Sequence, residues 1–264
     1  MFSGNLILIA AAVIPAVVLM IKVYNADKMD KESPSMMLSL LVFGVLSTTL
    51  AGFTERLGRS VLLSFTEQDS MLYNVLFYFV IVALSEEGFK YLVLKKKTWK
   101  SPEFNCQFDG VVYAVFVSLG FALWENIAYV LQYGFQTAIV RAITAVPGHA
   151  SFGVFMGIWY GLAKRYDYRG QSGKAAVMKK CAVIVPTLVH GTYDFLIASG
   201  ASDFIFVGFI VVVFAAAFRS VKKFSKEDEV IGYQGMTEEE RNNTYNGDIR
   251  KTPPHDDDIP FHIQ

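Results

Sequence analysis

The sequence predicts an all-α fold, a polytopic membrane helix bundle of about seven transmembrane helices. Hydrophobic residues make up 53% of the 264 residues and the mean hydropathy is +0.37, which is too apolar for an ordinary soluble domain of this length. Apolar runs near twenty residues recur along the chain, and this length of helix crosses the hydrocarbon core of a bilayer. The expected helices cover residues 4–21, 36–53, 71–94, 109–131, 142–163, 179–198 and 201–218.

The basic residues of the loops indicate the orientation. Seventeen lysines and arginines fall in loops 22–35, 95–108 and 164–180 and at the start of the tail, whereas three arginines fall on the other side. Because cytoplasmic loops carry the excess of basic residues, the N-terminus is expected outside and the C-terminus in the cytoplasm. No basic residue precedes the first helix, so we expect a retained helix and not a cleaved signal peptide.

Two parts of the chain differ in composition. Residues 1–219 form the expected transmembrane domain, and the polar residues 220–264 are expected to form a disordered cytoplasmic tail. The formal net charge is zero, which gives no reason to expect a nucleic-acid partner. Cys106 and Cys181 have no second cysteine or histidine at metal-ligand spacing, so both are expected to be free, reduced thiols.

The third expected helix carries charges in an otherwise apolar run. Glu86, Glu87 and Lys90 lie where each charge costs several kcal/mol if it is unpaired, roughly 2.5–3.5 on insertion scales. Glu86 and Lys90 are four residues apart and share a helix face, so a buried ion pair that orients the helix is the structural alternative. Such a pair accounts for one glutamate, which leaves the other for a second role.

The next three helices carry further polar residues. Asp109 begins the fourth helix, where it is expected to act as an N-cap, whereas Glu125 and Asn126 lie deep inside it. In the fifth helix, His149 begins a row of small residues at four-residue spacing, which lets a neighbouring helix approach closely. The row comprises His149, Gly153, Gly157 and Gly161.

The sixth helix carries a histidine and an acid on one face. His190 and Asp194 are four residues apart, so the carboxylate can accept a hydrogen bond from the ring and set its tautomer. Polar residues thus occupy four consecutive helices, and a shared polar site is the simplest explanation. The candidate site residues are Glu86, Glu87, Glu125, Asn126, His149, His190 and Asp194.

This residue set narrows the possible chemistry. No serine or cysteine lies in a nucleophile motif, so a covalent nucleophile is not expected. A glutamate can act as a general base toward water, and histidines can stabilise an oxyanion or deliver a proton. The alternative is a zinc ion held by His149, His190 and Glu86. The sequence has no His-Glu-x-x-His pair on one helix, which weakens this alternative, so no metal or other cofactor is expected.

Four motifs in this order resemble the PrsW family of intramembrane proteases, which is related to CAAX prenyl endopeptidases and bacteriocin-processing proteases. The first is Glu-Glu-x-x-Lys at Glu86–Lys90, and the second runs from Asp109-Gly110 to the Glu-Asn-x-x-Tyr that ends at Tyr129. The third is Arg141 followed by His149 and glycines, and the fourth is His-x-x-x-Asp at His190. The resemblance covers residues 80–200.

The resemblance implies an intramembrane endopeptidase of the bacterial plasma membrane that cleaves a membrane-anchored protein. Glu86 takes the role of general base, His149 and His190 hold the oxyanion, and Glu87 and Glu125 are supporting carboxylates. Asp194 stands where CAAX endopeptidases carry asparagine, which leaves open whether it holds the oxyanion or only orients His190. The implied partner is a single-pass anti-sigma factor, whose first cut, at site 1, starts sigma-factor activation in a stress response.

Two other classes of function use the same residues. A transporter or proton relay would place these acids and histidines along an ion path, but the sequence shows no internal repeat. A non-catalytic membrane scaffold would keep them for packing.

The depth of the polar residues in the membrane bears on whether they share one site. Counting from the loop edges places Glu86 roughly 10 Å nearer the cytoplasm than Glu125 and the histidines. Tilt of the helix or a break near Gly88 would remove this offset.

Overall fold

The computed structural model describes residues 2–29, 31–68 and 70–231, and within them the chain is helical with one isolated β-bridge, between Cys106 and Val230. Seven helical segments are long and apolar enough to cross a membrane, which confirms the predicted number of spans. The first two are α1 (Phe2–Ala26) and α2 (Pro34–Leu62). The third is formed by α3 (Met71–Val75), the π-helical η1 (Leu76–Ala83) and α4 (Leu84–Thr98), which follow one another without a break.

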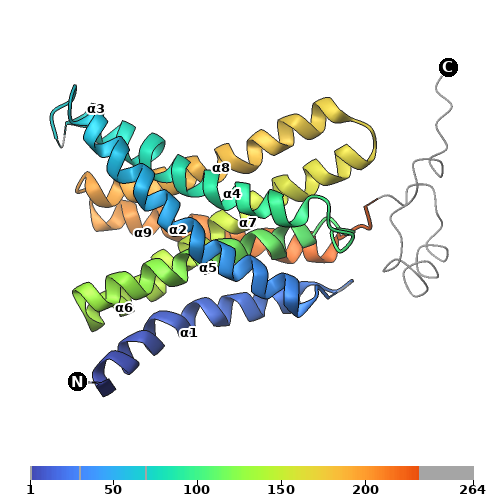
Figure 1. Cartoon of the computed structure of the whole chain (residues 1–264), viewed down its shortest axis with the longest axis horizontal. Coiled ribbons are helices and arrows are strands. Elements are labelled where there is room, and N and C mark those ends of the chain that lie inside the picture. The colour runs from blue at the N-terminus through green and yellow to red at the C-terminus, as the bar shows by residue number, and fades with distance from the viewer. Residues whose placement is uncertain (1, 30, 69, 232–264) are drawn as a thin grey trace.

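The remaining spans follow the same up-and-down path (Figure 1). They are α5 (Asp109–Tyr133), then α6 (Phe135–Ile143) with α7 (Ala145–Tyr168), then α8 (Ser172–Ala198) and α9 (Asp203–Lys226). The loops with many lysines and arginines all lie at one end of this bundle, which we call the basic end. It faces the C label in Figure 1.

The central helix of the bundle is α5. In its most apolar stretch 72% of residues are buried, against 17–33% for α1, α2, α8, α9 and the third span, so those helices face lipid over most of their surface. α5 packs against α1, α2 and α7, and α7 packs in turn against α8. This arrangement leaves α5 and α7 in the middle, where polar side chains are kept away from the hydrocarbon phase.

The predicted row of small residues is the contact between α7 and α5. A Cβ atom added at Gly157 would lie 2.4 Å from the Cα of Val111, and one at Gly161 would lie 2.2 Å from the carbonyl oxygen of Gln107. Glycine therefore permits this close backbone approach, as the four-residue spacing predicts.

Replacing Gly157 by alanine is expected to destabilise the protein by about 1–3 kcal/mol, the usual cost of overpacking a filled contact. The matched control is Gly52→Ala, because a Cβ added at Gly52 meets nothing within 4 Å. Unfolding of the detergent-solubilised protein followed by circular dichroism measures both. Equal midpoints for the two variants would contradict the close packing of α5 on α7.

Several predicted boundaries differ from the observed ones. α2 runs nine residues beyond its predicted end at residue 53, and α8 begins at Ser172 and not at residue 179. α9 continues to Lys226, so the first residues of the predicted disordered tail 220–264 are helical, whereas residues 232–264 lie outside the described residues. The apolar run marks only the part of a helix inside the hydrocarbon phase, and charged turns extend it on both sides.

Asp109 does not act as the predicted N-cap. Its Oδ2 accepts hydrogen bonds from the backbone N–H groups of two residues before the helix, Asn105 at 3.0 Å and Cys106 at 2.7 Å. Phe108 occupies the cap position and makes no side-chain cap bond. The carboxylate thus holds the loop before α5 and leaves the first turn of the helix uncapped by a side chain.

Candidate active site

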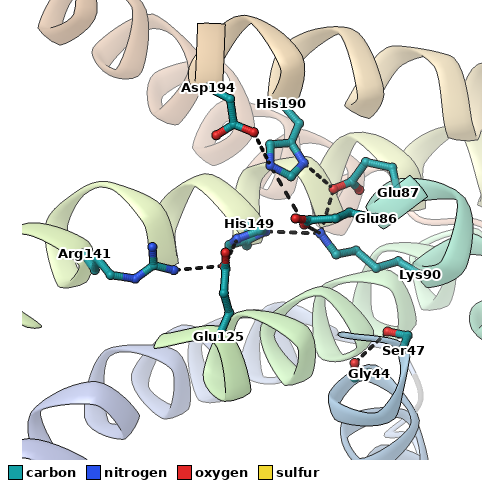
Figure 2. A network of polar contacts seen from close by, with 10 residues as sticks. All are labelled: Gly44, Ser47, Glu86, Glu87, Lys90, Glu125, Arg141, His149, His190 and Asp194. Atoms are coloured by element: carbon teal, nitrogen blue, oxygen red, sulfur yellow. Dashed lines mark hydrogen bonds and ion pairs between the residues drawn. The ribbon is translucent and has the colours of Figure 1, made fainter. Parts of the chain in front are cut away.

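All seven predicted site residues lie in one connected network in the middle of the bundle. Figure 2 shows this network without Asn126. The glutamate pair comes from α4, Glu125 and Asn126 from α5, His149 from α7, and His190 and Asp194 from α8. Glu86 therefore lies at the same depth in the bundle as Glu125 and the histidines, despite the offset that the sequence predicts. The chain is continuous through Gly88, and the departure from α-helical geometry is the π-helix η1, which directly precedes α4.

Lys90 occupies the centre of the network. Its ammonium lies 3.2 Å from Glu86 Oε2, 2.8 Å from Glu87 Oε1 and 3.2 Å from His149 Nδ1, and 4.0 Å above the ring of Phe121. The side chain is fully buried. A single positive charge thus holds two carboxylates and one imidazole together, and all three of its protons have acceptors.

The two adjacent glutamates face different surroundings. Glu86 lines a cavity of about 980 Å³ together with Glu125, His149, His190 and Asp194. Glu87 is fully buried behind them, and its Oε1 contacts both Lys90 and His190 Nδ1, the latter at 2.9 Å. Of the pair, Glu86 is therefore the carboxylate that is open to the cavity.

His190 lies between carboxylates. Nδ1 contacts Glu87 at 2.9 Å, while Nε2 lies 3.3 Å from Asp194 and 3.9 Å from Glu86. The ring also stacks on Phe152 with a centroid distance of 4.7 Å. Donation from both nitrogens satisfies acceptors on both sides, so the ring is fixed in position with its Nε2 toward the cavity.

His149 is held by a different pair of contacts. Nε2 lies 2.9 Å from Glu125, and Nδ1 lies 3.2 Å from the Lys90 ammonium. Because an ammonium only donates, Nδ1 must accept, and the proton of the neutral ring then lies on Nε2 and points to Glu125. His149 and His190 face each other with ring centroids 5.3 Å apart.

Arg141 and Asn126 support this arrangement from the side. The Arg141 guanidinium donates to Glu125 and to Asn126 Oδ1, each at 2.9 Å, and Asn126 Nδ2 donates to the backbone oxygen of Ala12 in α1. Asn126 is fully buried and does not line the cavity. Arg141 lies in α6, just before the helix break at Thr144 that separates α6 from α7, and its guanidinium reaches Glu125 of α5.

Glu55 was not among the predicted site residues. This half-buried residue of α2 lines the same cavity, as do the aromatic residues Phe77 and Tyr78 of the π-helix. The predicted helix ended at residue 53, which placed Glu55 in a loop next to two arginines. The helical spacing of the apolar residues after Glu55 is the only signal that could have extended the helix.

The side chains around the cavity are of the types that bind zinc, but the Lys90 ammonium already lies among them. Ligand atoms of Glu86, His149 and His190 lie within 4.8 Å of one another, and Glu87 and Glu125 bind the opposite nitrogens of the two rings, as supporting carboxylates do in zinc sites. Lys90 already contacts Glu86 and His149 Nδ1. Zinc would require its ammonium to withdraw toward Glu87.

Comparisons with known proteins identify the family of the chain. Residues 32–219 match the model of a family described as PrsW family intramembrane metalloprotease. Proteins named "Protease PrsW" are similar over most of the chain. The protein from Geobacillus kaustophilus is 33% identical over 82% of this chain and 91% of its own length. The Bacillus subtilis protein is 31% identical over 82% of this chain and 94% of its own.

No solved structure matches the chain. The family match covers every residue of the network except Ala12, and the relatives are covered almost completely. With its seven spans, the chain is a multi-pass membrane protein that belongs to the PrsW family of intramembrane proteases.

Proposed function

We propose that the protein hydrolyses a peptide bond of a membrane-anchored protein, with Glu86 as the general base and without a metal. The observation that carries this proposal is the position of Glu86, which is the carboxylate of the buried pair that lines the cavity and lies within 4.8 Å of both histidines. A base that faces a water-accessible cavity and is anchored by a neighbouring ammonium is placed to accept a proton from water.

The reaction balances with residues of this chain alone. Glu86 takes a proton from water as the water oxygen bonds to the carbonyl carbon of the substrate, and the carbonyl oxygen becomes an oxyanion. His190, whose Nε2 faces the cavity between Glu86 and Asp194, donates a hydrogen bond to that oxyanion, and His149 lines the same wall. Glu86 then gives its proton to the leaving nitrogen, and the carbon–nitrogen bond breaks to a carboxylic acid and an amine, which exchange a proton to give a carboxylate and an ammonium group.

The supporting residues act through the histidines. Glu87 and Glu125 each bind one ring nitrogen and fix its orientation, and Arg141 neutralises Glu125 from the other side. Asp194 contacts the cavity-facing nitrogen of His190, so it orients this donor. Asn126 positions Arg141 and lies outside the cavity.

The proposed substrate is a single-pass protein such as an anti-sigma factor, cut at its first site to start sigma-factor activation. The cavity is lined by residues of the connection between α8 and α9, including Gly200 and Ala201, and this connection lies at the end opposite the basic end. If the basic end faces the cytoplasm, as its lysines and arginines favour, the cavity is reached from outside. A cut from that side removes the external part of a single-pass protein first.

Metal dependence separates two mechanisms at this site. Zinc on His149, His190 and Glu86 would supply a Lewis acid and activate a bound water. Because Lys90 contacts two of these three donors, we expect purified protein treated with a strong chelator to keep its rate within about twofold. Loss of activity on chelation, restored by added zinc, would contradict the metal-free mechanism.

Cleavage in cells tests the function itself. The protein is co-expressed with a tagged single-pass anti-sigma factor from the same genome, beside a Glu86→Gln variant at matched membrane levels. A shorter tagged fragment with the native protein alone is the expected result. The same fragment from both strains would remove Glu86 as the base. If no fragment appears with this or any other single-pass membrane protein in a comparison of membrane fragments, the proteolytic function is wrong.

A further inference from the structure

A second group of buried acids lies at the basic end of the bundle, remote from the proteolytic site. Asp27 and Glu32 belong to the connection between α1 and α2, and Asp109 is the first residue of α5. Their exposed fractions are 2%, 4% and 0%. One carboxylate oxygen from each lies within 4.8 Å of the others, so acids from two distant parts of the chain converge on one small volume.

Hydrogen bonds account for only part of this group. Glu32 accepts a hydrogen bond from the Tyr113 hydroxyl, and Asp109 Oδ2 accepts two from the backbone. Asp109 Oδ1 is buried and has no hydrogen-bond partner among the described residues. Within residues 2–29, 31–68 and 70–231, neither Glu32 nor Asp109 forms an ion pair with a lysine, arginine or histidine. The Glu32 and Asp109 carboxyl groups also contact each other at hydrogen-bonding distance, and such a contact requires a proton or a cation between the two oxygens.

The neighbouring groups add negative charge. Asp228, which follows α9, lies close enough to Asp109 and Cys106 to form a second cluster with them, and its own Oδ2 is also unpartnered. Buried carboxylates this close together repel one another in a medium of low dielectric constant. A bound cation offsets this repulsion.

We propose that Asp27, Glu32 and Asp109 form a binding site for a hard divalent cation, of the class of Mg²⁺, Ca²⁺ and Mn²⁺. All three offer carboxylate oxygens, the ligands that such cations prefer. The buried Cys106 thiol belongs to the neighbouring group with Asp109 and Asp228 and is not one of these three ligands. The unpartnered Oδ1 of Asp109 is the oxygen that the cation satisfies.

The site joins the connection between α1 and α2 to the start of α5, beside the chain that follows α9. Asp228 Oδ1 accepts from Phe108 N at 2.8 Å, and Ile231 N donates to Asn105 O at 2.6 Å, so the chain after α9 pairs with the loop before α5. Glu103 of that loop accepts from Ser33 N, next to Glu32, at 2.9 Å. The cation stabilises this junction at the point where residues 232–264 begin.

Thermal unfolding of the purified full chain tests the site. The protein is freed of metal with EDTA and titrated separately with Mg²⁺, Ca²⁺ and Mn²⁺ in detergent. At a concentration about 100-fold above the dissociation constant, the midpoint is expected to rise by about 5 °C or more with at least one of them. Glu32→Gln and Asp109→Asn should lose this rise, whereas Glu67→Gln, an exposed acid at the other end, should keep it.

A direct count of bound Mn²⁺ by electron paramagnetic resonance does not depend on stability. One equivalent is expected to bind to the native protein and to Glu86→Gln, and none to Glu32→Gln. No midpoint rise with any of the three cations would overturn the proposal. So would a rise, or a bound Mn²⁺, that Glu32→Gln keeps and Glu86→Gln loses, because the cation would then lie in the proteolytic site.

Discussion

Replacing Glu86 by glutamine is expected to lower the turnover of purified, reconstituted protein at least 100-fold, the low end of what a general base contributes. Glutamine has the size of glutamate and can still accept the hydrogen bond from Lys90, but it cannot take a proton from water. Binding should change little, so kcat should fall while KM stays nearly constant. The rate is measured on a fluorescent reporter of the cleaved substrate.

Two other carboxylates make this prediction specific. Glu67→Gln changes an exposed acid outside the network and serves as the control for expression and reconstitution. Glu55 lines the same cavity and is the other glutamate that could act on water there. A Glu86→Gln protein that keeps more than a tenth of the native rate, beside a Glu55→Gln protein that loses it, would move the general base from α4 to α2.

Replacing Lys90 by methionine is expected to lower the free energy of unfolding by about 3–5 kcal/mol, the cost of removing one partner of a buried ion pair. Methionine keeps the length of the side chain but removes the ammonium that both Glu86 and Glu87 contact. Glu87 is fully buried, so water cannot replace this contact. Unfolding in a denaturing detergent titration measures the loss.

The control for this change lies on the same helix. Lys96→Met removes an exposed ammonium from α4 and should alter stability by less than about 0.5 kcal/mol. Adding Glu87→Gln to Lys90→Met removes one of the unpaired charges and should recover part of the loss. A Lys90→Met protein as stable as the Lys96→Met protein would show that the network does not depend on this ion pair.

The membrane spans could be predicted from sequence because length and apolarity alone define them. All seven were predicted, whereas their ends were not, since charged turns beyond the hydrocarbon phase carry no apolar signal. The break at Thr144 and the π-helix η1 were also missed. The break at Thr144 comes three residues before Pro147, whose nitrogen has no hydrogen to donate to the carbonyl oxygen of Ile143, so it has a local cause. The π-helix η1 contains no proline and depends on packing between helices.

The members of the site could be predicted for a similar reason. Four-residue spacing on one helix predicts the contacts of Glu86 with Lys90 and of His190 with Asp194, and both are present. Contacts between helices, such as that of Glu87 with His190, depend on tilt and rotation that no spacing encodes. The same limit made the depth of Glu86 relative to the histidines unpredictable.

In the proposed mechanism, the glutamate pair and the histidines form one active site. The most direct test is whether the effects of substitutions in the two groups add in the double variant. The measurement is kcat/KM for Glu86→Gln, His190→Gln and the double variant, on one substrate and in one lipid. Residues that act as a unit in one reaction lose little more together than the more damaging single change alone, so the double variant should match Glu86→Gln within a few-fold. If the two losses multiply in the double variant, Glu86 and His190 act independently, and the single-site account is wrong.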